Sequence, residues 1–312
     1  MAQKIIRIAT RKSPLALWQA NHIRDQLLHY WPALRIELLP MTTSGDAFLK
    51  DKLVDIGGKG LFVKELEESL LDKRADLAVH SMKDVPATFP PGLSLAAICK
   101  RDNPLDALVS KVYATLHALP AGAIIGTTSL RRQSQLLTLR PDLCIKPLRG
   151  NINTRISKMQ AGEYDAIVLA AAGLERMGMH SLISEVLSED MMLPAPGQGA
   201  LGIECRIDDH DLQAFIAPLN DPLSALCVYT ERRVNVQLGG NCHTPLAVYC
   251  KPLANSFLLL HTKIATLDGR IMMSNSQRGH QDDAAALADQ CAATLLADGA
   301  AHMLASATHY GQ

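Results

Sequence analysis

The chain has 312 residues, and its 31 Lys and Arg residues balance 31 Asp and Glu residues, so the formal net charge is zero. Hydrophobic residues make up 48% of the sequence and charged residues 20%, as in ordinary globular proteins. These values exclude a disordered tail, a collagen-like fibre and a protein that binds polyanions through bulk charge.

The N-terminal residues lack the long apolar stretch and the small-residue cleavage site of a signal peptide, so we expect a cytoplasmic protein. The longest apolar run, residues 166–174, is far too short to span a bilayer, and we expect no membrane association. The seven cysteines show no paired spacing, which favours reduced thiols.

The first hundred residues alternate between strand and helix patterns. Ser13 and Pro14 form an N-cap followed by a proline at the first helical position. Glycines punctuate residues 46–60 and predict a mobile loop. The predicted elements are strands at 4–9, 35–40 and 76–80 and helices at 14–28 and 61–73. Such alternation predicts a mostly parallel α/β sheet.

The same pattern restarts near residue 105, with Ser129 as a helix N-cap. It predicts strands at 123–126, 143–148 and 165–169 and helices at 130–139, 153–160 and from 170 to about 177. Two α/β units predict two lobes with a ligand-binding cleft between them. Residues 191–203, which contain two prolines and three glycines, are predicted to cross between the lobes and return to the first.

The last ninety residues predict a smaller α+β domain with an antiparallel sheet. The expected elements are a helix at 222–236, apolar runs at 247–250 and 257–267, a hairpin turn at Asp268–Gly269, a strand at 270–273 and a helix at 282–305. We therefore predict three domains: residues 1–100 with about 194–218, residues 101–193, and residues 219–312.

Basic residues gather between Thr128 and Lys158, where Asp142 is the one acid. The seven are Arg131, Arg132, Arg140, Lys146, Arg149, Arg155 and Lys158. Arg131 and Arg132 follow a predicted N-cap, and guanidinium groups beside free helix N–H groups bind anions. Charge alone favours the alternative of a solvated basic face. No aromatic residue is present to stack bases, so the arginines favour a small, multiply carboxylated ligand over nucleic acid.

Two further residues are candidates for chemistry. Asp84 follows a buried strand, where it could stabilise a developing cation or exchange a proton, or could simply be a turn residue. His80, at the strand end, is interpreted as a buried structural histidine. Cys242 lies in a Gly-Gly-Asn loop and is either an attachment point or an inert thiol. No second cysteine lies two to four residues away, so we expect no metal site.

Seven segments together resemble the porphobilinogen deaminase family, also called hydroxymethylbilane synthases, from Ile6 to about Leu246. They are IRIATRKSPLALWQA, GGKGLFVKELE, VHSMKDVP, GTTSLRRQSQL, LRGNINTR, LPAPGQGA and ERRVNVQLGGNCHTPL. The resemblance implies three domains, two of them similar to the lobes of periplasmic binding proteins. It also implies a monomeric transferase of heme biosynthesis, which condenses four porphobilinogen molecules head to tail with loss of ammonia. Hydrolysis then releases 1-hydroxymethylbilane for a downstream tetrapyrrole-cyclising enzyme.

The resemblance also assigns roles to residues. It implies a dipyrromethane cofactor joined by a thioether to Cys242, with Asp84 as the catalytic acid. The residues implied to hold or line the cofactor are Ser81, Lys83, Thr127, Ser129, Arg131, Arg132, Arg155, Ala170, Arg176 and Gly199. Those implied to hold incoming substrate are Arg11, Ser13, Arg149 and Gln198. Residues 46–60 resemble the family's mobile flap.

Three residues depart from the family pattern: Asn241 before the cysteine, Asp55 in the flap, and Asn153, where asparagine could keep a positive φ. Two other functions remain open. A non-catalytic, two-lobed protein that binds a small anion would explain the lobes and the arginines but not the Cys242 loop. A degenerate family member would bind pyrroles without turnover.

Overall fold

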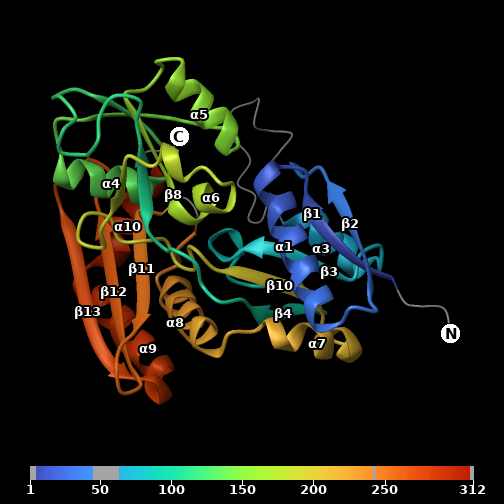
Figure 1. Ribbon diagram of the computed structural model, residues 1–312. Helices are drawn as coiled ribbons and strands as arrows, with labels where there is room; N and C mark the ends of the chain where they lie inside the picture. Colours follow the sequence, from blue (N-terminus) through green and yellow to red (C-terminus); the bar gives the residue numbers. More distant parts are fainter. Residues whose placement is uncertain (1–4, 45–62, 242–243, 310–312) are drawn as a thin grey trace. The chain divides into compact units, whose positions relative to one another are not determined.

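The computed structural model describes residues 5–44, 63–241 and 244–309 (Figure 1). The chain divides into two compact units. The first comprises residues 1–102 and 200–225, and the second comprises residues 103–199 and 226–312. Each unit has its own sheets and its own core, and each is described separately below.

The first unit is built on a five-stranded sheet with the order β2-β1-β3-β10-β4. The strands are β1 (Ile5–Arg11), β2 (Arg35–Met41), β3 (Leu77–Ser81), β4 (Leu93–Ile98) and β10 (Leu201–Arg206). β10 runs antiparallel to both of its neighbours, whereas the other four strands share one direction. This confirms the mostly parallel sheet, and it confirms that the chain returns to the first lobe after residue 200.

Helices cover both faces of this sheet because successive strand residues point to opposite sides. α1 (Pro14–Tyr30) begins where the Ser13 hydroxyl accepts a hydrogen bond from the Ala16 N–H, and it packs with α7 (His210–Ile216) against Ile6 and Ile8. α3 (Lys64–Leu71) packs against Ala9 and Ala78 on the other face. Two 3-10 turns, η3 (Met82–Asp84) and η5 (Ala217–Leu219), complete the unit.

The second unit repeats this plan in a sheet with the order β7-β6-β8-β5-β9. Its strands are β5 (Asp106–Val109), β6 (Ile124–Gly126), β7 (Cys144–Lys146), β8 (Ala166–Ala170) and β9 (Glu185–Leu187). β5 runs antiparallel to β8 and β9. The accompanying helices are α4 (Leu130–Leu139), α5 (Ile152–Gln160), α6 (Ala171–Arg176) and the 3-10 turn η4 (His180–Leu182). α4 and α5 begin at the side-chain N-caps Ser129 and Asn151.

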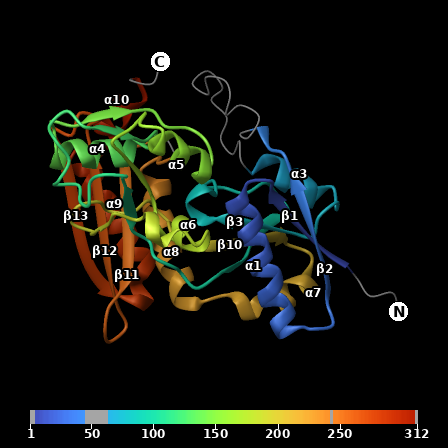
Figure 2. The same ribbon diagram turned by 45° about the horizontal axis from the view of Figure 1, so that its top comes forward.

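The C-terminal residues form an antiparallel sheet of three strands, in orange and red in Figure 2, with helices packed against it. The elements are α8 (Pro222–Gln237), β11 (Leu246–Pro252), β12 (Phe257–Ala265), β13 (Met272–His280), the 3-10 turn η6 (Gln281–Asp283), α9 (Ala284–Ala297) and α10 (Ala300–His309). The α/β fold, with two sheet-based lobes and a small antiparallel C-terminal sheet, agrees with the expected fold class.

Two predicted elements were wrong in their extent. The predicted helix at 282–305 is two helices, because Gly299 adopts a φ of 98° and a left-handed residue ends an α-helix. The strand predicted at 270–273 continues to His280. After Met272 its outward-facing residues Ser274, Ser276 and Arg278 are polar, and its inward-facing residues include Asn275 and Gln277, so hydrophobicity alone does not mark it.

The C-terminal sheet is joined to the arginine-rich lobe within the second unit. Gln133 Nε2 donates to Leu267 O (3.2 Å), and Thr138 Oγ1 donates to Gly269 O (2.9 Å). Lys251 Nζ lies 2.6 Å from Glu189 Oε2. The buried Glu231 of α8 accepts from Gly197 N at 2.7 Å and from Cys250 N at 2.8 Å. The predicted boundary between the second and third domains falls inside this unit, so the three-domain division stays a prediction.

No helix among residues 5–44, 63–241 and 244–309 is both long enough and apolar enough to cross a bilayer.

Candidate functional site

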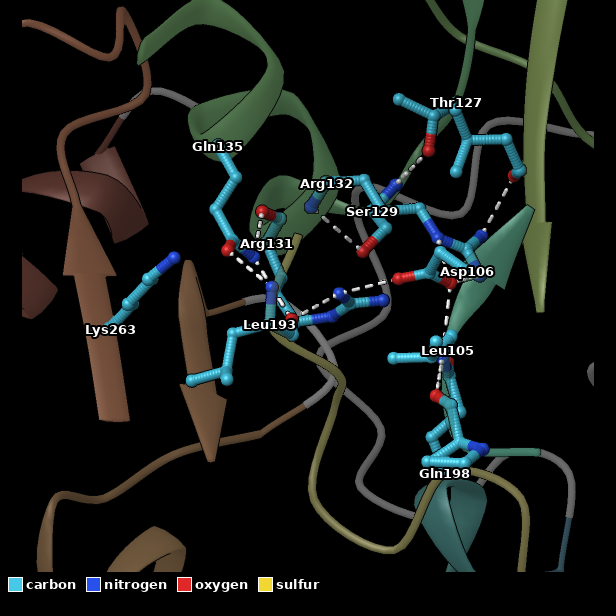
Figure 3. A network of polar contacts seen from close by, with 12 residues as sticks. Leu105, Asp106, Thr127, Ser129, Arg131, Arg132, Gln135, Leu193, Gln198 and Lys263 are labelled. Atoms are coloured by element: carbon cyan, nitrogen blue, oxygen red, sulfur yellow. Dashed lines mark hydrogen bonds and ion pairs between the residues drawn. The ribbon is translucent and has the colours of Figure 1, made fainter. Parts of the chain in front are cut away.

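A buried carboxylate, Asp106, lies at the centre of the predicted arginine site (Figure 3). Asp106 begins β5 and is 0% exposed. Arg131 Nη1 lies 2.8 Å from its Oδ2, and Arg132 Nη2 lies 2.7 Å from its Oδ1. Gln198 Nε2 donates to the same Oδ1 at 3.1 Å. We call Asp106, Arg131, Arg132 and Gln198 the arginine hub. Three of its four members are residues that sequence reasoning had selected.

The surrounding backbone fixes both guanidinium groups. Arg131 Nη1 also donates to Leu193 O (2.7 Å), and Arg132 Nη1 donates to Val168 O (3.0 Å). Ser129 caps the helix that carries them, and its N–H donates to the Thr127 hydroxyl at 3.1 Å. These contacts hold the two arginines, which are 5% and 6% exposed, at the first turn of α4.

The hub carries an excess of positive charge. Burial alone would raise the pKa of Asp106, but attraction by Arg131 and Arg132, with their hydrogen bonds, holds it well below the usual range. Burial lowers the pKa of Arg131, and Asp106 opposes that effect, so the guanidinium stays protonated. One carboxylate against two guanidinium groups leaves one net positive charge beside a helix N-terminus. This arrangement suits a carboxylate ligand.

The charge count alone allowed a solvated basic face for this region, and that interpretation was wrong for Arg131 and Arg132, which are buried. It was also incomplete, because Asp106 was not selected. The available signal was an acid in the first position of a buried apolar strand, which requires a buried partner. That partner comes from residues about twenty-five positions later in the chain, so local patterns do not reveal it.

Other predicted residues of the second unit lie outside the hub. Arg176 Nη2 donates to Gly199 O at 2.7 Å, so the structure brings this predicted pair together. Arg155 Nε donates to Gly150 O at 2.7 Å. Ala170, which precedes α6, and Arg149, which precedes α5, are half-buried, as are Arg155 and Arg176.

Asn153 does not adopt the conformation that we expected. It lies inside α5 in a helical position, and Gly150 has the positive φ, 119°. Gly150, three residues earlier, supplies the positive φ of this loop, and the Asn153 departure places no strain on the backbone.

In the first unit, the end of β3 presents the predicted catalytic segment. Ser81 Oγ accepts from Gln19 Nε2 at 2.9 Å, and Met82 is buried. Asp84 ends the turn η3 with an exposed side chain, and Lys83 beside it is half-buried. Arg11 is half-buried at the end of β1. His80 is buried with its Nε2 2.8 Å from Glu204 Oε2, which confirms its interpretation as a buried, hydrogen-bonded histidine.

Several predictions fall outside the described residues: those on Cys242, on Asp55 and on the flap at 46–60. The residue before the cysteine is described. Asn241 N donates to Thr244 Oγ1 at 3.1 Å, and Thr244 Oγ1 donates to Asn241 O at 2.7 Å. The backbone N–H and C=O of Asn241 are thus both bonded to the Thr244 hydroxyl, although Asn241 departs from the family pattern.

Two family models match the chain. The model described as "Porphobilinogen deaminase, dipyromethane cofactor binding domain" matches residues 6–214, and "Porphobilinogen deaminase, C-terminal domain" matches residues 225–297. The chain belongs to the porphobilinogen deaminase family. Proteins named porphobilinogen deaminase from Legionella pneumophila strains Lens and Paris are 63% identical to it over 306 residues, 98% of this chain and 99% of each relative.

Two solved structures align with this porphobilinogen deaminase family member at much lower sequence identity. A putative methionine-binding lipoprotein from Bacillus subtilis aligns at 16% identity and a TM-score of 0.44, over 72% of this chain and 93% of that one. A periplasmic substrate-binding protein of an ABC transporter from Coxiella burnetii aligns at 13% identity and a TM-score of 0.44, over 73% and 96%. Similarity at this level says nothing about the ligand of this chain.

Family membership favours an enzyme over the non-catalytic anion-binding protein that the arginines alone left open. The family models also cover the C-terminal residues, which a two-lobed binding protein leaves unexplained.

Proposed function

We propose that this chain is a hydroxymethylbilane synthase. It polymerises four porphobilinogen molecules head to tail, releases four ammonia molecules, and frees 1-hydroxymethylbilane by hydrolysis. The observation that carries this proposal is the match of a family model for dipyrromethane binding to residues 6–214, which include the whole arginine hub. Tetrapyrrole biosynthesis is the corresponding pathway.

The described residues fit a dipyrromethane cofactor. Its acetate and propionate groups require cations, and the hub supplies two guanidinium groups against one buried carboxylate. When bound, the cofactor supplies the pyrrole terminus on which the chain grows. Arg131 and Arg132 would hold its carboxylates, and the other residues implied for this task are Ser81, Lys83, Thr127, Ser129, Arg155, Ala170, Arg176 and Gly199. Cys242 would supply the thioether sulfur.

Asp84 is proposed as the catalytic acid. Porphobilinogen loses ammonia as its pyrrole nitrogen pushes electrons outward, so positive charge develops on the ring. A carboxylate that accepts a hydrogen bond from the pyrrole N–H stabilises this charge, and it can hold the proton that the reaction moves. The exposed position of Asp84 at the end of η3, the turn that follows β3, supports this role, because a reacting group must be reachable by substrate.

Arg11, Ser13, Arg149 and Gln198 are proposed to bind incoming porphobilinogen. Gln198 donates to Asp106 and therefore belongs to the same hydrogen-bonded hub as Arg131 and Arg132. This contact links the residues proposed for substrate with those proposed for the cofactor. A ligand carboxylate that shifts either arginine thus also changes the environment of Gln198.

We further propose that the protein is a cytoplasmic monomer of three domains and that its product passes to a tetrapyrrole-cyclising enzyme. The open-chain bilane that leaves the site still has to be closed into a ring, which requires another catalyst. The proposed chemistry needs no metal.

Mass spectrometry of the intact, denatured protein tests the proposed function. An excess over the sequence mass equal to two porphobilinogen units less their ammonia, mapped to Cys242, is expected. The Cys144→Ser variant, which removes an exposed thiol of the second unit, should keep this excess, and Cys242→Ser should lose it. A wild-type protein that gains no mass after incubation with porphobilinogen, or a pyrrole attached at another residue, would contradict the proposal.

A further inference from the structure

A second buried polar cluster lies in the first unit, between α3 and the sheet. Glu204 of β10 is 0% exposed, His80 of β3 is 6% exposed and Glu67 of α3 is 8% exposed. His80 Nε2 lies 2.8 Å from Glu204 Oε2. Glu is among the residues that proteins bury least, and burying its charge without compensation is costly. The cluster therefore needs an explanation other than packing.

Strand register places the three side chains in one layer. Glu204 lies opposite Ala78, and Gly202 lies opposite His80, so the side chains of Ala78, His80 and Glu204 point to the same face of the sheet. Ala78 belongs to the core cluster that α3 covers. Glu67 projects from α3 into this layer, and the cluster thus joins three elements: α3, β3 and β10.

The cluster holds two carboxyl groups and a single imidazole. Among the described residues, neither Glu67 Oε1 nor Glu204 Oε1 has a hydrogen-bond partner, although both atoms are buried. Burial and the charge of Glu204 raise the pKa of Glu67 to about 7, while His80 opposes the shift. Below about pH 7 Glu67 therefore keeps its proton, and the buried layer does not hold two carboxylate charges at once.

The surrounding charged groups do not provide another partner for Glu67. On α3, Glu68 is exposed, raises the pKa of Glu67 and pairs with Lys64 at 3.7 Å. On the sheet, Arg206 of β10 and Arg7 of β1 both bind Asp76, and Arg206 also binds Asp209. β4 carries no charged residue. Arg11 of β1 lies two residues beyond Ala9, which pairs with Ala78, and the charged groups that shift the pKa of Glu67 are Glu204, His80 and Glu68.

The cluster lies directly behind the proposed catalytic segment. His80 is followed by Ser81 and by the turn that ends at Asp84. Close contacts join this turn to β10 and the residue before it. Met82 N donates to Ala200 O at 3.0 Å, and Met82 Sδ lies where a Cβ on Gly202 would be. A displacement of His80 relative to Glu204 therefore displaces the backbone that carries Asp84.

We propose that Glu67, His80 and Glu204 form a buried proton-sharing cluster that positions the Ser81–Asp84 segment for catalysis. The three are positioning residues, and the inference rests on the proposed role of Asp84. The shared proton keeps α3 attached to the sheet. Loss of that proton places two like charges in the layer and loosens the end of β3.

Thermal unfolding as a function of pH tests the shared proton independently of activity. The pKa of Glu67 in the folded protein lies above its ordinary value of 4.5, so the wild-type protein loses stability as the pH rises from 4.5 to about 7. In Glu67→Gln this loss should be absent, because the amide does not ionise. Glu68→Gln, on the exposed side of the same helix, should parallel the wild type. If the stability of Glu67→Gln changed with pH in parallel with that of the wild type, the proposal of a shared proton on Glu67 would be overturned.

Steady-state kinetics test the positioning role. In Glu204→Gln we expect a decrease in kcat of about tenfold or more, because small misplacements of a catalytic group are costly, with KM changed less than about twofold and normal covalent loading. The pH profile of kcat should lose its inflection near neutrality, which a loss of stability alone would not cause. Unchanged kcat and profile would overturn the positioning role.

The two experiments separate the possible failures. If Glu204→Gln does not fold, the kcat–pH profile of Glu67→Gln decides the positioning role: an unchanged inflection overturns it. If the wild type does not consume porphobilinogen, the proposed function fails and the positioning role fails with it, whereas the thermal profiles still decide whether the proton is shared.

Discussion

Asp106 shows how one buried side chain organises a whole anion site. Its carboxylate meets Arg131, Arg132 and Gln198, which come from the first turn of α4 and from the segment that precedes β10. Without this carboxylate, two buried guanidinium groups would face each other. With it, they are fixed in place and still retain an excess positive charge for a ligand.

Replacing Asp106 by Asn tests the hub. Removing one partner of a buried ion pair costs about 3 to 5 kcal/mol of unfolding free energy, and we also expect reduced covalent loading. Urea unfolding and intact mass measure the two effects. Asp142→Asn is the matched control, because Asp142 pairs with Arg140 at the surface of the same lobe, and it should unfold like the wild type. Equal stability of both variants would contradict the role of Asp106 as the buried partner of the hub arginines.

Replacing Asp84 by Ala tests its proposed chemistry. Turnover of porphobilinogen should fall about a hundredfold or more, because a positioned acid or base contributes that much. The bound cofactor should remain, since Asp84 is not proposed to attach it. Product formation and intact mass are the measurements. Asp25→Ala removes another exposed carboxylate of the first unit and should leave turnover unchanged. Undiminished turnover in Asp84→Ala would refute the assigned role.

At the scale of single elements, prediction succeeded where local signals agree. Ser129, with the apolar spacing behind it, predicted a helix at 130–139, and α4 spans Leu130–Leu139. The split between α9 and α10 was missed because Gly299 stands within an alanine-rich sequence that favours helix throughout. Likewise the sequence marked Arg131 and Arg132 as anion ligands but left out Asp106, because their pairing depends on tertiary contacts between β5 and α4.

At Gly269, in the turn between β12 and β13, we predict that a side chain would destabilise the protein. Its φ is 71°, and a Cβ there would lie 2.4 Å from Thr138 N on α4. Gly269→Ala should therefore destabilise the protein by more than the roughly 1 kcal/mol that a left-handed alanine costs. Gly122→Ala is the matched control, since φ is 78° and nothing lies within 4 Å of the added Cβ. Denaturant unfolding compares them, and equal losses would show that the hairpin does not need close contact with α4.

At the scale of the whole molecule, the two lobes repeat one topology. In each five-stranded sheet the antiparallel strand is the first strand after the chain has crossed from the other unit, β5 in one and β10 in the other. Each of these strands also carries a fully buried acid, Asp106 or Glu204. Alternating strand and helix patterns predicted the two lobes, but the sequence does not reveal which strands pair.

The Cys242→Ala variant tests how the cofactor affects the whole protein. We expect it to fold, because Asp106 already partners the hub arginines internally, and to melt several degrees below the wild type. A bound ligand stabilises the folded state that binds it, and about 1 kcal/mol shifts the Tm of a chain of this size by roughly 2–4 °C. Calorimetry measures the difference, with Cys144→Ser as the control. Identical melting of loaded wild type and Cys242→Ala would mean that the hub does not hold the cofactor.

The contacts of Thr138, Gln133 and Glu231 with the C-terminal residues have a consequence for where the growing tetrapyrrole chain starts. They place the arginine hub and the chain on both sides of the proposed anchor in one unit. The proposed attachment point of the growing tetrapyrrole and the cations proposed to hold its first rings thus belong to the same compact unit. In the proposed reaction, each added ring then places the free end of the chain farther from that fixed starting point.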